Sequence, residues 1–178
     1  VSPYLPLPPD GTLPPVARDR EVISLPDGGT LDLEAGFVRR TIAGKELVML
    51  AFNGQHPGPL LRVDQGSTIV VNFRNLTPFH TAVHWHGLRL DNRYDGVPGI
   101  TQEPVEPGGT FQYRVHFPDA GIYWYHPHHR EDVQQELGLS GNLLVDARDP
   151  DALGPVNREE VLLVDDLLLE EGGLHPFG

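Results

Sequence analysis

Short runs of alternating apolar and polar residues, separated by clusters of glycine and proline, limit what this chain can fold into. The run from Ser67 to Arg74 places its apolar residues on one side: Ile69, Val71 and Phe73. The run from Thr110 to Phe117 alternates in the same way. Alternation of this kind is typical of strands that bury one face of a sheet. With 20 glycines and 18 prolines in 178 residues, long helices are disfavoured. The pattern predicts an all-β fold, an antiparallel sandwich or barrel.

The remaining segments fit the same architecture. One short helix of about two turns is predicted over 131–137, after which Gly138 is placed to end it. Residues 1–20 are rich in proline and predict an extended arm. We expect one β-domain over 21–150 and a final strand within 151–178. Further strands are expected at 31–42, 45–52, 60–63, 122–128, 142–145 and 161–169.

Composition excludes several kinds of function. The formal net charge is −12, so the chain repels phosphate backbones and anionic lipid surfaces, and nucleic acid is an unsuitable partner. The chain has no cysteine, which excludes disulfides, thiolate metal sites and cysteine nucleophiles. No stretch approaches the roughly 18 apolar residues that a membrane span needs.

Two histidine pairs carry the chemistry of the chain. They are His84-Trp85-His86 and His126-Pro127-His128, both in aromatic surroundings. Residues i and i+2 of a strand share a face, so each pair can direct two imidazoles at one point. Imidazole suits copper, zinc, iron and nickel. The spacing predicts a metal site built only from nitrogen, and leaves the identity of the metal open.

The other histidines have ordinary interpretations. His56 lies in a turn, His116 ends an alternating strand, and His175 is near the end of the chain. We expect these three to be structural or exposed. His80 and His129 stand close to the two pairs and are interpreted as neighbours of the ligands rather than ligands.

The pairs belong to a longer pattern that resembles a known family. From about residue 37 to 147 the chain resembles the first cupredoxin domain of multicopper oxidases, with the laccase-like members as the best fit. The segments that carry the resemblance are Asn53-Gly54-Gln55, Pro57-Gly58-Pro59, His84-Trp85-His86-Gly87, Asp95-Gly96-Val97-Pro98, Thr101-Gln102, Pro107-Gly108-Gly109, Tyr113, Pro118-Asp119-Ala120-Gly121 and Tyr123-Trp124-Tyr125-His126-Pro127-His128.

The resemblance implies a Greek-key cupredoxin domain that supplies part of a three-copper cluster. By position, His84 would bind the type 2 copper, His86 and His126 one type 3 copper, and His128 the other. Asp95 would match an acid that helps deliver protons as dioxygen is reduced to water. Without the resemblance, Asp95-Gly96 is interpreted as a plain turn.

The resemblance also implies what lies outside this chain. Type 1 copper needs a cysteine, so it would sit in another domain, as would the other cluster ligands. Residues 151–178 would contain the start of a linker to a second domain. The partners would be the remaining cupredoxin domains, dioxygen and a phenol or similar one-electron donor. The chain alone is then expected to be inactive, and the oxidase to be secreted or periplasmic.

Two other functions are weighed against this one. A non-redox module could hold a single copper or zinc ion with the four histidines. A cupin also uses a His-x-His pair, but its usual glutamate is absent here, where residues 88–91 read Leu-Arg-Leu-Asp.

Overall fold

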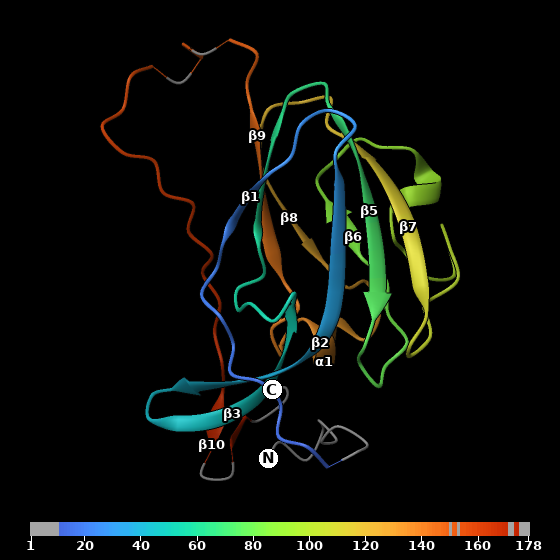
Figure 1. The fold of residues 1–178 in the computed structure, drawn as a ribbon, viewed down its shortest axis with the longest axis vertical. Coiled ribbons are helices and arrows are strands. Elements are labelled where there is room, and N and C mark those ends of the chain that lie inside the picture. The colour runs from blue at the N-terminus through green and yellow to red at the C-terminus, as the bar shows by residue number, and fades with distance from the viewer. Residues whose placement is uncertain (1–10, 150, 153, 171–172, 175–178) are drawn as a thin grey trace.

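Two β-sheets face each other and enclose most of the buried apolar side chains (Figure 1). The computed structural model describes residues 11–149, 151–152, 154–170 and 173–174. Residues 1–10 of the expected arm, and His175, therefore lie outside the described residues. The described part of the arm pairs with the domain, since Arg39 N donates to Pro15 O at 2.9 Å and Ala17 N donates to Arg39 O at 2.9 Å.

The sheets contain five and four strands. The first has the order β1 (Val22–Ser24), β4 (Leu60–Asp64), β9 (Gly141–Asp146), β8 (Gly121–His126) and β6 (His84–His86). The second has the order β3 (Lys45–Phe52), β2 (Thr30–Ile42), β5 (Thr68–Asn75) and β7 (Thr110–His116). A small hairpin joins β10 (Leu169–Glu170) to β11 (Gly173–Leu174). The helical elements are η1 (Asn92–Tyr94) and α1 (Glu131–Gln134).

The expected all-β sandwich with one short helix is confirmed, but the pairing is not purely antiparallel. The pairs β1–β4, β2–β5 and β4–β9 are parallel. The chain crosses between the two sheets, so strands that are distant in sequence become neighbours and can run in the same direction. Alternation along a strand predicts which face is buried and does not predict the direction of its neighbour.

The helix is shorter than its sequence suggests. It was expected over 131–137, but α1 ends at Gln134 and the chain continues in turns to Gly138. The backbone after α1 turns more tightly than an α-helix, because Gly138 N donates to the carbonyl three residues earlier, Gln135 O, at 2.8 Å. The carbonyl of Leu137 accepts instead from Leu50 N of β3 at 2.7 Å. Contact with the sheet thus replaces a further helical turn.

The strand expected over 161–169 is also wrong for most of its length. Among the described residues of this segment, ladder pairing begins only at Leu169. Residues 156–169 run along the outside of the domain beside β1 (Figure 1). Val161 is buried against Leu60 and Leu144, whereas Leu162 and Val164 are exposed. Alternation is present in the sequence, but residues 161–168 form no ladder hydrogen bonds with a strand.

Buried aromatic residues hold β6 and β8 in place. Trp85, Tyr113 and Tyr125 are fully buried, and both tyrosines contact Trp85, with ring centroids 5.6 and 5.8 Å from it. Tyr125 Oη donates to Pro59 O at 2.7 Å, and Val83 N donates to Tyr113 Oη at 2.9 Å. Because Trp85 and Tyr125 point into the core, the residues on either side of them point out of it.

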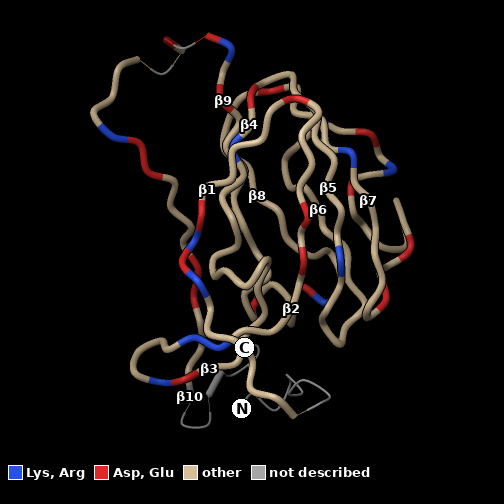
Figure 2. Tube along the Cα trace, in the orientation of Figure 1, with Lys and Arg blue, Asp and Glu red and all other residues tan. Residues whose placement is uncertain are grey.

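Among the described residues, Lys and Arg are interspersed with Asp and Glu along loops and strands, including the inner strands β2 and β5 (Figure 2). In the described part of the chain, no helix has the length and apolar character required to cross a membrane.

Candidate metal centre

The two histidine pairs meet where β6 and β8 pair. In this antiparallel register His84 lies opposite His126, Trp85 opposite Tyr125 and His86 opposite Trp124. The aromatic pair in the middle faces the core. The histidines and Trp124 therefore share the other face, as the spacing predicted.

Three of the four predicted ligands come together closely. His84, His86 and His126 each offer a ring nitrogen, and these nitrogens lie within 4.8 Å of one another. Within this group, His86 Nδ1 lies 3.3 Å from His126 Nε2. Two ligands about 2.0–2.1 Å from one ion, at a tetrahedral angle, are separated by roughly the same distance. The spacing is therefore compatible with a shared metal ion.

His128 lies beside this group rather than within it. The strand expected over 122–128 ends at His126, because Pro127 has no N–H to continue the ladder. The His128 ring centroid is 5.2 Å from that of His84 and 6.1 Å from that of His126. Its side chain is 42% exposed, compared with 15% for His84.

Hydrogen bonds to Nδ1 select the nitrogen that each ring can offer to a metal. His84 Nδ1 is 2.7 Å from Asp95 O, and His126 Nδ1 is 2.8 Å from Pro127 O. Both acceptors are carbonyls, so each Nδ1 must carry the proton and each Nε2 keeps its lone pair. His128 Nδ1 lies 2.9 Å from Glu131 Oε1, within ion-pair distance.

His126 is the most enclosed of the four. Its exposed fraction is 3%, and its ring stacks on the Trp124 indole with centroids 3.9 Å apart and planes at 18°. Burial, with smaller contributions from the neighbouring histidines, lowers the pKa of His126 to about 4. The ring is therefore neutral at pH 7, which is the protonation state that a metal ligand requires.

The donor set fits copper. All the convergent atoms are imidazole nitrogens, which suit copper, and copper stands at the top of the affinity order for divalent first-row metals. Asp95, the predicted proton carrier, lies at the same place, with Oδ1 3.4 Å from His84 Nδ1 and a side chain that is 31% exposed. It also accepts at its backbone oxygen, so it contacts the site in two ways.

The remaining histidines in the described part of the chain lie outside this group. His56 contacts Arg40, and burial lowers its pKa to about 4. His116 Nδ1 is 3.0 Å from Thr68 Oγ1 at an exposed position. His80 and His129 offer backbone carbonyls to Gln134 Nε2, at 3.0 and 2.6 Å.

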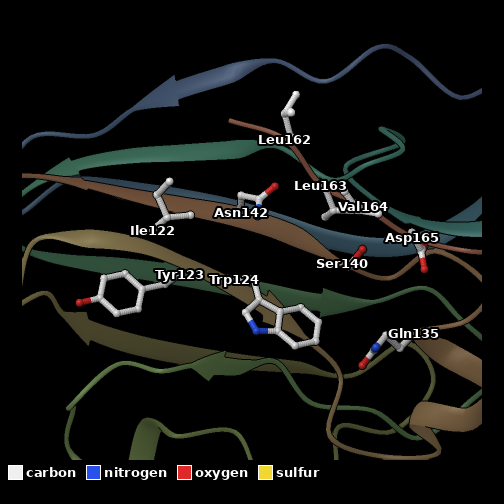
Figure 3. A pocket seen from close by; sticks show the side chains of 10 residues that line it. All are labelled: Ile122, Tyr123, Trp124, Gln135, Ser140, Asn142, Leu162, Leu163, Val164 and Asp165. Carbon is white, nitrogen blue, oxygen red and sulfur yellow. The ribbon is translucent and has the colours of Figure 1, made fainter. Parts of the chain in front are cut away.

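The face of Trp124 is also exposed to a pocket. Ile122, Trp124 and Asn142 line it from the sheet, and Leu162 and Val164 line it from the C-terminal segment (Figure 3). Trp124 therefore both lines this pocket and stacks on the His126 ring.

Two contributors to the site are not predicted from the sequence. Glu131 is expected only as the start of a helix, although it stands three positions after His128. Gly96 is expected only as part of a turn. Its φ is +74°, and a Cβ there would overlap the Val83 carbonyl and lie 2.9 Å from His84 N. Only contacts across the fold reveal that role.

The fold and the site define a class: a two-sheet β-sandwich that presents clustered histidines at one edge. Comparison with known proteins makes the class specific. The family model described as multicopper oxidase matches residues 36–150. The chain therefore belongs to the multicopper oxidase family, which confirms the resemblance found in the sequence. Members of this family are copper-dependent oxidoreductases.

Individual relatives agree. Copper resistance protein A of Pseudomonas syringae pv. tomato is 36% identical over 149 residues, covering 84% of this chain and 24% of that protein. Laccase-1 of Emericella nidulans is 41% identical over 133 residues, covering 68% of this chain and 21% of that protein.

Solved structures show the same fold. The blue copper oxidase of Nitrosomonas europaea has a TM-score of 0.66 at 34% identity, covering 76% of this chain and 41% of that one. Lac15 from a marine microbial metagenome has a TM-score of 0.62 at 46% identity, covering 67% of this chain and 33% of that one. The chain spans about a quarter of the length of the curated relatives named above.

Proposed function

We propose that this chain is the domain of a laccase-like multicopper oxidase that supplies half of the histidine ligands of a three-copper cluster. The remaining ligands and the type 1 copper would come from other cupredoxin domains of the same oxidase. Dioxygen would be reduced to water at the cluster, while phenols or similar one-electron donors are oxidised at the type 1 copper. The similarity to laccases and copper resistance proteins supports this assignment.

One observation carries the proposal: His84 lies opposite His126 across β6 and β8, which brings the two His-x-His pairs to the same edge of the sheet. The 3.3 Å between His86 Nδ1 and His126 Nε2 supports their assignment to one type 3 copper. His84 would bind the type 2 copper, and His128, on the flank of the group, the second type 3 copper. Copper bound in this position would supply the redox chemistry of dioxygen reduction.

The residues of this chain would hold the cluster and deliver protons to it. The carbonyls of Asp95 and Pro127 fix the Nδ1–H tautomers of His84 and His126, which leaves Nε2 as the ligand atom. The stacked Trp124 keeps water from one side of His126. The partly exposed Asp95 carboxyl lies between solvent and His84, where it would pass protons inward.

Several features of the whole oxidase belong to the same proposal. Residues 21–150 would form the first cupredoxin domain, residues 1–20 its arm, and residues 151–178 the start of the linker to the second domain. This chain alone would be inactive, because the chain contains no cysteine for a type 1 copper. The oxidase would act outside the cytoplasm, as a secreted or periplasmic protein.

Copper binding by the isolated chain tests this proposal. We expect the 178-residue chain to bind copper weakly and without a fixed ratio, because half of the cluster's ligands are absent. A full-length oxidase that carries this domain should retain its copper during dialysis against a chelator. The metal content after dialysis measures copper retention by the isolated chain and by the full-length oxidase. If the isolated chain held one copper or zinc ion tightly, it would instead be a self-sufficient, non-redox metal module.

A further inference from the structure

We propose that Glu131 is a positioning residue for His128: its carboxylate holds the His128 ring in the Nδ1–H tautomer and presents Nε2 to the metal. This inference rests on the proposed function in taking His128 as a copper ligand. The contact that supports it lies within this chain, since Glu131 Oε1 is 2.9 Å from His128 Nδ1.

The other histidines of the site show why His128 needs such a partner. His84 and His126 are largely enclosed, and backbone carbonyls accept their Nδ1–H protons. His128 is 42% exposed, and the Glu131 carboxylate, with Oε1 2.9 Å from Nδ1, is within ion-pair distance of its ring. Glu131 therefore does for His128 what burial and the backbone do for the others. A carboxylate acceptor also forms a stronger bond than a carbonyl.

The position of Glu131 is fixed by the fold. Arg130 adopts a left-handed backbone, with φ 46° and ψ 54°, which turns the chain sharply between His128 and α1. Val133 and Gln134 of α1 are buried, and Gln134 Nε2 ties the helix to the carbonyls of His80 and His129. The helix is thus anchored to the domain by Val133 and Gln134.

Neighbouring charges leave the Glu131 carboxylate available. The closest basic side chain in sequence, Arg130, pairs with Asp132 instead, with Nε 2.9 Å from Oδ1 and Nη2 2.9 Å from Oδ2. Asp132 is 50% exposed, close to the 45% of Glu131, and lies on the same helix. Asp132→Asn therefore removes a comparable acid without touching a histidine, and serves as the matched control.

The tautomer of His128 tests the inference directly on the metal-free 178-residue chain. Long-range ¹H–¹⁵N NMR, at a pH well above the ordinary histidine pKa, distinguishes Nδ1–H from Nε2–H. We expect the Nδ1–H tautomer in the wild type and in Glu131→Gln, which keeps an acceptor oxygen. Glu131→Ala should shift His128 toward Nε2–H, and Asp132→Asn should not. A wild-type His128 in the Nε2–H form, or no change in Glu131→Ala, would overturn the inference.

Copper retention in the full-length oxidase provides the second readout. Loss of an outer partner of a metal ligand typically weakens metal binding about 10- to 100-fold. Glu131→Ala should lose copper to a chelator more readily by that factor, Glu131→Gln by less, and Asp132→Asn not at all. His128→Ala separates the two claims. If it releases copper while Glu131→Ala retains it, the proposed function stands and the role of Glu131 fails.

Discussion

Replacing His126 with alanine in the full-length oxidase should abolish type 3 copper absorption and reduce dioxygen consumption by at least about 100-fold. Loss of an outer-sphere partner alone costs roughly 10- to 100-fold, so loss of a ligand should cost more. His126 is also the most enclosed of the four histidines and lies 3.3 Å from His86 Nδ1. Absorption spectra and oxygen-electrode rates measure the two effects.

His116→Ala is the control for this experiment. His116 ends β7 at an exposed position and contacts Thr68 rather than the other histidines. Its spectrum and rate should match the wild type. If the His126→Ala oxidase kept full activity and its type 3 absorption, His126 could not be a ligand of the cluster.

Gly96→Ala should destabilise the chain strongly and displace His84. A left-handed backbone costs a non-glycine residue roughly 1–2 kcal/mol, and steric overlap in a packed region costs about 1–3 kcal/mol more. Here φ is +74°, and the new Cβ would overlap the Val83 carbonyl directly before β6. Either β6 or the loop that contains Gly96 must move. We expect the free energy of unfolding in urea to fall by about 2–5 kcal/mol.

Gly99→Ala separates backbone strain from steric overlap. Gly99 has nearly the same φ, +76°, but a Cβ there would meet nothing within 4 Å. It should therefore lose only the conformational part, roughly 1–2 kcal/mol. Only Gly96→Ala should also weaken copper retention, because Asp95 O holds His84 Nδ1. Equal losses of stability in both variants would contradict the proposed contact with Val83.

The strands and the histidine pairs could be predicted because they depend on local periodicity. The compact apolar run at 45–52 and the alternation at 110–117 match β3 and β7 closely, and the i, i+2 spacing anticipates the shared face of His84 and His86. The family resemblance then indicated that the metal is copper. These features are encoded within a few neighbouring residues, so the sequence alone reveals them.

The predictions from the sequence fail where contacts between residues distant in the chain determine the structure. Three parallel strand pairs result from crossings between sheets, which alternation does not encode. α1 stops early because Leu137 O bonds to β3, and the strand expected over 161–169 finds no partner edge for most of its length. Glu131 and Gly96 were missed for the same reason. Their roles depend on what lies opposite them in space.

Anomalous diffraction from copper-loaded crystals of the full-length oxidase, at wavelengths on either side of the copper absorption edge, tests the central claim most directly. The account predicts copper peaks about 2.0–2.1 Å from ring nitrogens of all four histidines. His86 and His126 should share one ion, while His84 and His128 each bind another. Copper absent from this edge of the sandwich, or a single ion held by this chain alone, would contradict the account.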